Sequence, residues 1–107
     1  MKDAKALFIV VNAGFAEEIV AIAREEGASG ATIMNARGEG LKPQMIMGIT
    51  IDSEKEIVLS VVEENTAAAI MEAVKQKAGI GTPAHGVCFY VPVNKMSGTV
   101  SSGAYEA

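Results

Sequence analysis

The stretch "ALFIVVN", residues 6–12, decides the fold of this chain. It is a continuous run of β-branched and other apolar residues that ends shortly before a glycine, which indicates a buried strand. The residues that follow, 14–27, place Ile19 and Ile22 on one helical face, with acidic residues in the first turn and a glycine at the end. Residues 30–38 form a second predicted strand, so the first third of the chain predicts β-α-β.

The second half of the chain repeats this order. Its predicted elements are a strand at 45–51, a turn at 52–55, a strand at 56–62, a helix at 64–78 with Asn65 as its N-cap, and a strand at 86–93. We therefore predict an α+β fold, a ferredoxin-like βαββαβ sandwich whose four-stranded antiparallel sheet carries two helices on one face. The strands at 6–12 and 56–62 should be central because they are the most continuously apolar. A flavodoxin-like unit needs more helices than this chain provides.

The predicted central strands are apolar on both faces. Leu7 and Ile9 alternate with Phe8 and Val10, and the strand at 56–62 shows the same pattern. Two helices cover only one face of a four-stranded sheet, so the other face should be buried by something else. A symmetric oligomer that packs sheet against sheet is the simplest solution.

Composition limits the classes of function. Half of the residues are hydrophobic and 21% are charged, which is typical of one folded domain. The net charge is −4 and the nine Lys and Arg residues are scattered, so the clustered cations of a nucleic-acid binder are missing. No apolar stretch is long enough to span a bilayer, no secretory signal opens the chain, and one cysteine cannot form an internal disulfide. We expect a cytoplasmic protein that binds small molecules or other proteins.

The stretch "GIGTPAHGVCFYVPV", residues 79–93, contains the only histidine and the only cysteine. A metal site needs three or four ligands, and His85 and Cys88 have no second histidine or cysteine to complete one. Cys88 lies within the predicted strand, where a cysteine is usually inert packing. His85 precedes the strand, where either a ligand contact or a backbone contact fits. No pair of carboxylates and no triad suggests an acid–base enzyme.

The stretch "ARGEGLK", residues 36–42, is rich in glycine and follows a predicted strand. It lacks the P-loop pattern and opens no helix, so neither a P-loop nor a dinucleotide-binding fingerprint applies. By itself it indicates either a turn that needs positive φ or a ligand-binding loop.

Three segments together resemble the nitrogen-regulatory P-II family and its P-II-like relatives. They are "EEGASGATIMNARGEG" (25–40), "KEIVLSVVEEN" (55–65) and "KAGIGTPAHGVCFYVPV" (77–93). The resemblance covers residues 4–93 and implies a single domain over 1–107, with a short T-loop region at 38–54. Residues 94–107 are small and polar, so we expect a mobile or weakly docked tail. The resemblance implies a homotrimeric, non-enzymatic sensor. In this family, adenine nucleotides bind between subunits, and the T-loop docks onto a target enzyme, regulator or membrane transporter.

The resemblance also assigns site residues. The positions that it implies for effector binding are Thr32, Gly38, Gly40, Lys55, His85 and Gly86. The phosphate loop departs from the family, because His85 replaces an aspartate, Ala84 a glycine and Val87 a lysine. No arginine follows Arg37, so the C-terminal arginines that reach a neighbour's phosphates are also missing. The effector that the resemblance implies is an adenine nucleotide (ADP, AMP or ATP). The lost cations favour either a nucleotide less charged than ATP or a different ligand.

The resemblance implies neither a catalytic residue nor a resident metal. One alternative with a similar trimeric fold is a metal-binding protein, like the divalent-cation-tolerance proteins, that uses His85, Cys88 and methionines. A third hypothesis is an enzyme with Cys88 as its nucleophile.

Overall fold

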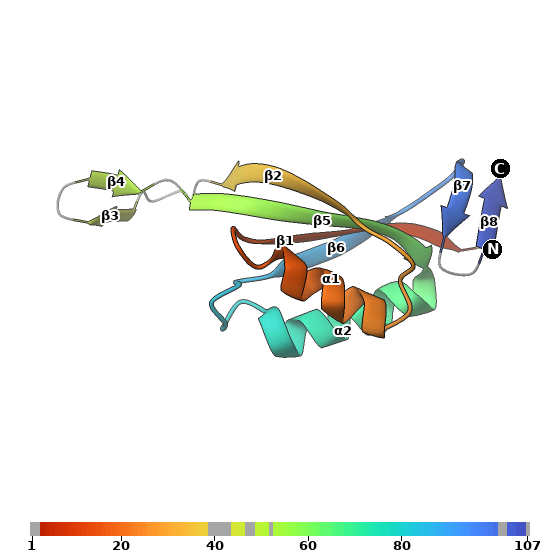
Figure 1. Ribbon diagram of the computed structural model, residues 1–107, viewed down its shortest axis with the longest axis horizontal. Coiled ribbons are helices and arrows are strands. Elements are labelled where there is room, and N and C mark those ends of the chain that lie inside the picture. Colours follow the sequence, from red (N-terminus) through yellow and green to blue (C-terminus); the bar gives the residue numbers. More distant parts are fainter. Residues whose placement is uncertain (1–2, 39–43, 47–48, 52, 101–102, 107) are drawn as a thin grey trace.

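The computed structural model describes residues 3–38, 44–46, 49–51, 53–100 and 103–106. Its elements are, in chain order, β1 (Ala4–Asn12), α1 (Ala16–Glu25), β2 (Thr32–Gly38), β3 (Gln44–Ile46), β4 (Ile49–Ile51), β5 (Ser53–Glu63), α2 (Glu64–Ala78), β6 (Val87–Pro92), β7 (Ser97–Val100) and β8 (Gly103–Glu106). One antiparallel sheet has the strand order β2-β5-β1-β6, and both helices lie on one face of it (Figure 1). This confirms the predicted ferredoxin-like fold, with the two most apolar strands at its centre.

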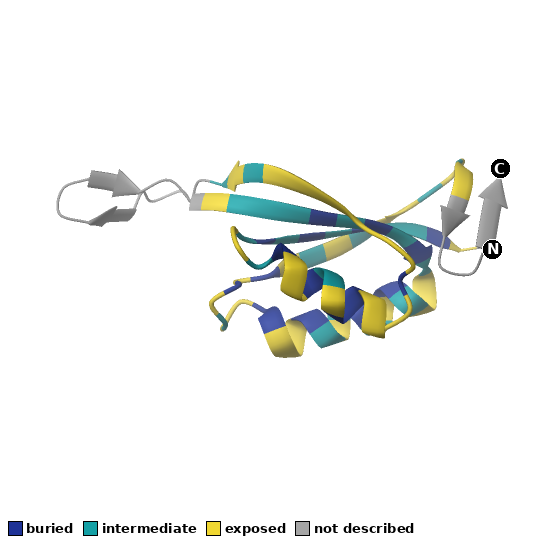
Figure 2. Cartoon of the chain, viewed as in Figure 1, coloured by how far each residue is buried: buried dark blue, intermediate teal, exposed yellow. Residues whose placement is uncertain are grey.

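The core lies between this sheet and the two helices (Figure 2). β1 and β5 pair along the whole of β1, from Ala4↔Glu63 to Asn12↔Lys55, so alternate residues of both strands point at the helices. The largest fully buried side chains are Leu7, Ile9, Ile19, Ile70, Val11, Val58, Val62 and Val74. Each of the four elements β1, β5, α1 and α2 therefore contributes apolar side chains to a single core.

The stretch 45–51, predicted as one strand, folds differently. β3 and β4 pair with each other in a separate two-stranded sheet, with Gln44 opposite Ile51. The predicted turn at 52–55 is also wrong at residues 53–55, because β5 already begins at Ser53 and pairs with β2 from there. Asp52 lies outside the described residues. Backbone hydrogen bonds to β2 outweigh the turn preference of these polar residues.

Helix α2 has the predicted bounds, but its N-cap lies two residues before the predicted one. Its N-cap is Glu63 in an extended conformation, so Asn65 lies inside the first turn and is not the cap. β5 runs directly into α2, and the amide of Glu64 donates to the carbonyl of Asp3 at 3.0 Å. The carbonyl of Asp3 thus accepts from the first amide of the helix, whereas the sequence predicted that the Asn65 side chain would satisfy this end. Among the described residues, no helix combines the length and apolarity that crossing a membrane requires.

The C-terminal tail is more regular than expected. β7 and β8 pair as an antiparallel hairpin, with Ser97 opposite Glu106. A backbone ladder can order a segment of small polar residues even where few apolar side chains are available to pack.

The sheet face opposite the helices is apolar and open, as the alternation in the strands predicted. Phe8 and Phe89 stack across β1 and β6 with their ring centroids 5.2 Å apart. Val87, Phe89 and Val91 are nevertheless 46%, 48% and 43% exposed. Within the described part of the chain, this face has no cover.

Candidate functional site

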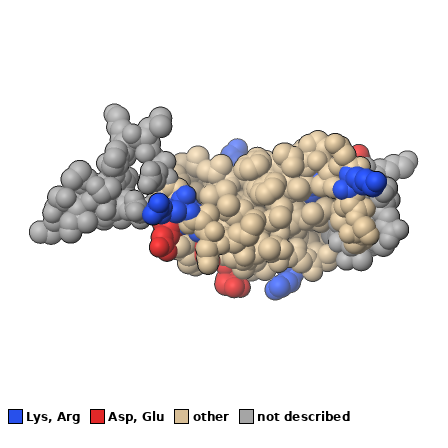
Figure 3. Space-filling model, turned by 90° about the horizontal axis from the view of Figure 1, so that it is seen from above, with Lys and Arg blue, Asp and Glu red and all other residues tan. Residues whose placement is uncertain are grey.

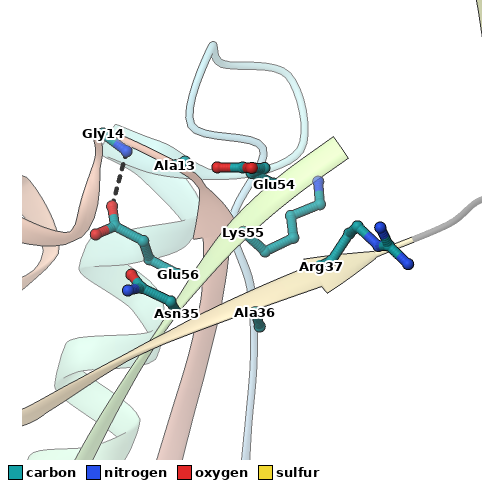
Figure 4. A pocket seen from close by; sticks show the side chains of 8 residues that line it. All are labelled: Ala13, Gly14, Asn35, Ala36, Arg37, Glu54, Lys55 and Glu56. Carbon is teal, nitrogen blue, oxygen red and sulfur yellow. Dashed lines mark hydrogen bonds between the residues drawn. The ribbon is translucent and has the colours of Figure 1, made fainter. Parts of the chain in front are cut away.

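A cleft of about 480 Å³ lies at the end of the sheet where β1 and β2 finish and β5 begins. It is lined by Ala13, Gly14, Asn35, Ala36, Arg37, Glu54, Lys55 and Glu56 (Figure 4). Two cations and two carboxylates thus surround it. Its lining includes Arg37, next to the last residue of β2, and Glu54, next to Ser53, with which β5 starts.

Glu56 holds the start of helix α1. Its Oε1 atom accepts hydrogen bonds from the amide of Gly14 at 2.7 Å and from the amide of Ala16 at 3.3 Å. The residue at the N-cap position, Phe15, has no side chain that could do this. A carboxylate from β5 therefore neutralises the positive end of the helix dipole, which would otherwise attract an anionic ligand.

Lys55 points toward the end of β1, where it meets Asn12. Its Nζ atom donates to Asn12 Oδ1 at 2.6 Å, and Asn12 Nδ2 donates to the carbonyl of Pro83 at 2.8 Å. The lysine also runs beside Gly38, where an added Cβ would lie 3.3 Å from Lys55 Cε. Two of the predicted site residues, Gly38 and Lys55, are thus in contact, and Asn12 joins them as a residue that the sequence did not reveal.

The loop between α2 and β6 carries the other predicted pair, His85 and Gly86. His85 is exposed, has a φ of +51° and places Nδ1 3.0 Å from the carbonyl of Ile80. Its amide donates to Thr82 O, and the Thr82 hydroxyl donates to Gly79 O. Histidine tolerates this left-handed conformation better than most residues, although it still costs backbone energy. His85 thus has the backbone contact that the sequence left open.

Gly86 has a packing role in addition to any contact with a ligand. Its amide donates to the carbonyl of Ala78 at 2.7 Å, and an added Cβ would lie only 2.4 Å from that oxygen. The closeness of the loop to the last turn of α2 therefore requires glycine here.

Thr32 is not near Lys55. Thr32 opens β2 and pairs with Leu59, whereas Gly38 ends the same strand. They are six residue steps apart along the strand, or about 20 Å, so one subunit does not bring Thr32 to the cleft. Gly40 lies outside the described residues.

Cys88 packs against the core from β6, opposite Ile9 of β1. Its burial raises the pKa of the thiol, so less of the nucleophilic thiolate forms at neutral pH than in an exposed cysteine. This agrees with the structural interpretation of the residue. In the part of the chain that the structure describes, no group of three or more His, Cys, Asp or Glu side chains could hold a metal ion.

Solved structures with this architecture include a PII-like signalling protein and two structures of B. subtilis GlnK. A protein described as PII-like and signalling, from Thermus thermophilus, matches with a TM-score of 0.67 and 22% identity over 85% of this chain and 87% of that one. The B. subtilis GlnK–ATP complex matches with a TM-score of 0.69 and 19% identity, over 89% and 85% of the two chains. A further structure of B. subtilis GlnK matches with a TM-score of 0.67 and 17% identity, over 90% of each of the two chains. At such identities these matches establish the fold.

The class of protein defined by this fold is the ferredoxin-like PII type. The sequence model for "Nitrogen regulatory protein P-II" matches residues 4–100, and the chain therefore belongs to the nitrogen regulatory protein P-II family. No curated protein sequence matches the chain closely enough to add to these comparisons.

The close approach of Gly86 to Ala78 O is testable by substituting two glycines of the same loop with alanine. Gly86→Ala should lower the free energy of unfolding by about 1–3 kcal/mol, because the loop backbone must move away from Ala78 O. Gly81→Ala, in the same loop with nothing within 4 Å of the added Cβ, should leave stability unchanged or raise it by up to about 1 kcal/mol. Urea denaturation of both variants measures the difference, and equal stabilities would contradict the assigned packing role.

The state of Cys88 is testable by labelling the native protein with a thiol reagent. Because burial raises the pKa of this thiol, its labelling rate should stay below that of a free cysteine at neutral pH. The rate should increase with pH only above the range where a free thiol titrates, and should reach the free value in denaturant. Rapid labelling of the folded protein at neutral pH would reopen the hypothesis of a catalytic cysteine.

Proposed function

We propose that this chain is a non-enzymatic P-II-like regulatory protein whose site binds a small effector between subunits. The observation that carries the proposal is the meeting of Lys55, Gly38 and Asn12 beside the point where the chain leaves β2. A ligand anion that binds the lysine would contact the base of the 38–54 region directly. Binding would then favour one arrangement of that region, and this arrangement would select the partner protein.

The proposed assembly is a homotrimer. The open face of the sheet is lined by Phe8, Phe89 and valines, and Figure 3 views this side, where charged side chains lie mainly at its edges. Contiguous exposed apolar surface of this kind is typical of an interface between subunits. P-II proteins form trimers, and packing the three sheets together would remove this surface from water.

The proposed effector is an adenine nucleotide with fewer charges than ATP. ATP is bound in the B. subtilis GlnK complex, which has the same fold. In this chain the cleft sets Lys55 and Arg37 against Glu54 and Glu56, so its cations and carboxylates balance. Each charge-assisted bond to a phosphate contributes about 1.5–3 kcal/mol, and nearby carboxylates repel the same phosphate. ADP or AMP therefore suits this cleft better than ATP.

The proposed partner is a membrane transporter or a metabolic enzyme, which the protein would bind in the cytoplasm. The 38–54 region would carry the contact, because its two ends join the cleft through Gly38 and through the start of β5. A surface that changes with the ligand would then lie next to the effector site, within the single domain proposed for residues 1–107.

Effector binding is testable by calorimetry with ATP, ADP and AMP. We expect at least one to bind, and Lys55→Met to weaken the tightest by tenfold or more, since tenfold corresponds to about 1.4 kcal/mol. Lys95→Met removes a charge from an exposed residue outside the cleft and should change nothing. Absence of heat from all three nucleotides would exclude the nucleotide version of the proposal.

Assembly is testable by light scattering during size-exclusion chromatography. We expect a mass three times that of the chain, and a shift toward monomer in Phe89→Glu, which puts a charge on the apolar face. Ala21→Glu, on the exposed side of α1, serves as the matched control and should remain trimeric. A monomeric wild-type protein at micromolar concentration would contradict the proposed assembly.

A further inference from the structure

The Asn12 side chain connects two regions that are far apart in the sequence. Its Oδ1 atom accepts from Lys55 Nζ at 2.6 Å, 43 positions away, and its Nδ2 atom donates to Pro83 O at 2.8 Å, 71 positions away. We name this pair of hydrogen bonds the Asn12 bridge. One of its ends lies beside Gly38 and the other lies in the loop that carries His85.

The chemistry of the partners fixes the orientation of this amide. The Lys55 ammonium can only donate, so it must face the oxygen, and the Pro83 carbonyl can only accept, so it must face the nitrogen. The oxygen of the planar Asn12 amide therefore binds Lys55, and its nitrogen binds Pro83. A rotation of the amide that follows the lysine would move Nδ2 away from Pro83, and the charge of the lysine also polarises the second bond.

Asn12 holds loop 79–86 at the two residues that precede His85, the residue with a strained backbone. Besides the Asn12 bridge, the amide of Asn12 donates to Ala84 O at 2.9 Å, so β1 fixes the two carbonyls that directly precede His85. His85 has a φ of +51°, a conformation that persists where surrounding contacts impose it. Weakening the contacts of Asn12 would therefore loosen the part of the loop that stores backbone strain.

We infer that Asn12 is a positioning residue that couples Lys55 to loop 79–86. In the unliganded protein, Lys55 supports the loop through Asn12 without touching it. This much does not depend on any ligand. If the proposed function holds, a phosphate that draws the ammonium away from Asn12 changes the loop from a distance, so one binding event alters both the base of the 38–54 region and loop 79–86.

The coupling is testable by hydrogen exchange in the whole, unliganded protein. The reporters are the amides of Asn12, His85 and Gly86, whose acceptors lie in the loop or at the end of α2. Lys55→Met should speed exchange at these amides by about three- to tenfold relative to amides of α1, the change expected from weakening one hydrogen bond. Lys95→Met should leave all of them at the wild-type rates, and Lys55→Arg, which keeps a donor, should restore most of the protection.

A second variant separates coupling from general loss of stability. Asn12→Ala should speed exchange at His85 and Gly86 as well, and Lys55→Met added to it should have no further local effect, because the connection is already cut. Unchanged exchange at His85 and Gly86 in Lys55→Met, or full additivity of the two substitutions, would overturn the inference. Calorimetry with ATP, ADP and AMP tests the proposed function separately, so a protein that binds none of them can still show or lack the coupling.

Discussion

The register between β1 and β5 is the constraint on which the rest of the structure depends. It pairs Ala4 with Glu63 at one end and Asn12 with Lys55 at the other. Because side chains alternate along a strand, this register sends Leu7 and Val58 into the core together. A shift by one residue would turn that apolar set outward and would also separate Asn12 from Lys55. The register between β1 and β5 therefore determines both the packing of the core and the contact between Asn12 and Lys55.

Alternation also explains how two neighbouring residues at the start of β5 serve different purposes. Glu56 points toward the helices and holds the first amides of α1, whereas Lys55 points the opposite way and meets Asn12. The strand thus supplies a negative charge to the helix dipole and a positive charge to the proposed effector site. Because Glu56 already binds the end of the helix, the positive charges that line the cleft are those of Lys55 and Arg37.

Sequence reasoning predicted the elements whose pattern is local and missed the contacts that need tertiary pairing. The strand at 6–12 and the stripe of α1 have clear periods, and both formed as predicted. The single strand at 45–51 was wrong because β3 and β4 pair with each other, and the Asn65 cap was wrong because Asp3 supplies a backbone acceptor; no local pattern shows either partner. Gly38 and Lys55 came from the family resemblance, while Asn12 became visible only through partners 43 and 71 positions away.

Loop 79–86 shows why rare residue types alone are a weak guide to chemistry. The glycine at 86 is required by the approach to Ala78 O, and the cysteine at 88 packs against the core, so neither needs a ligand to explain its place. His85 is different, because it is exposed and its backbone is held in an unfavourable region by contacts that start at Asn12. We infer that the Asn12 bridge makes the position of this exposed histidine depend on Lys55, so a ligand that bound the lysine would change the loop as well.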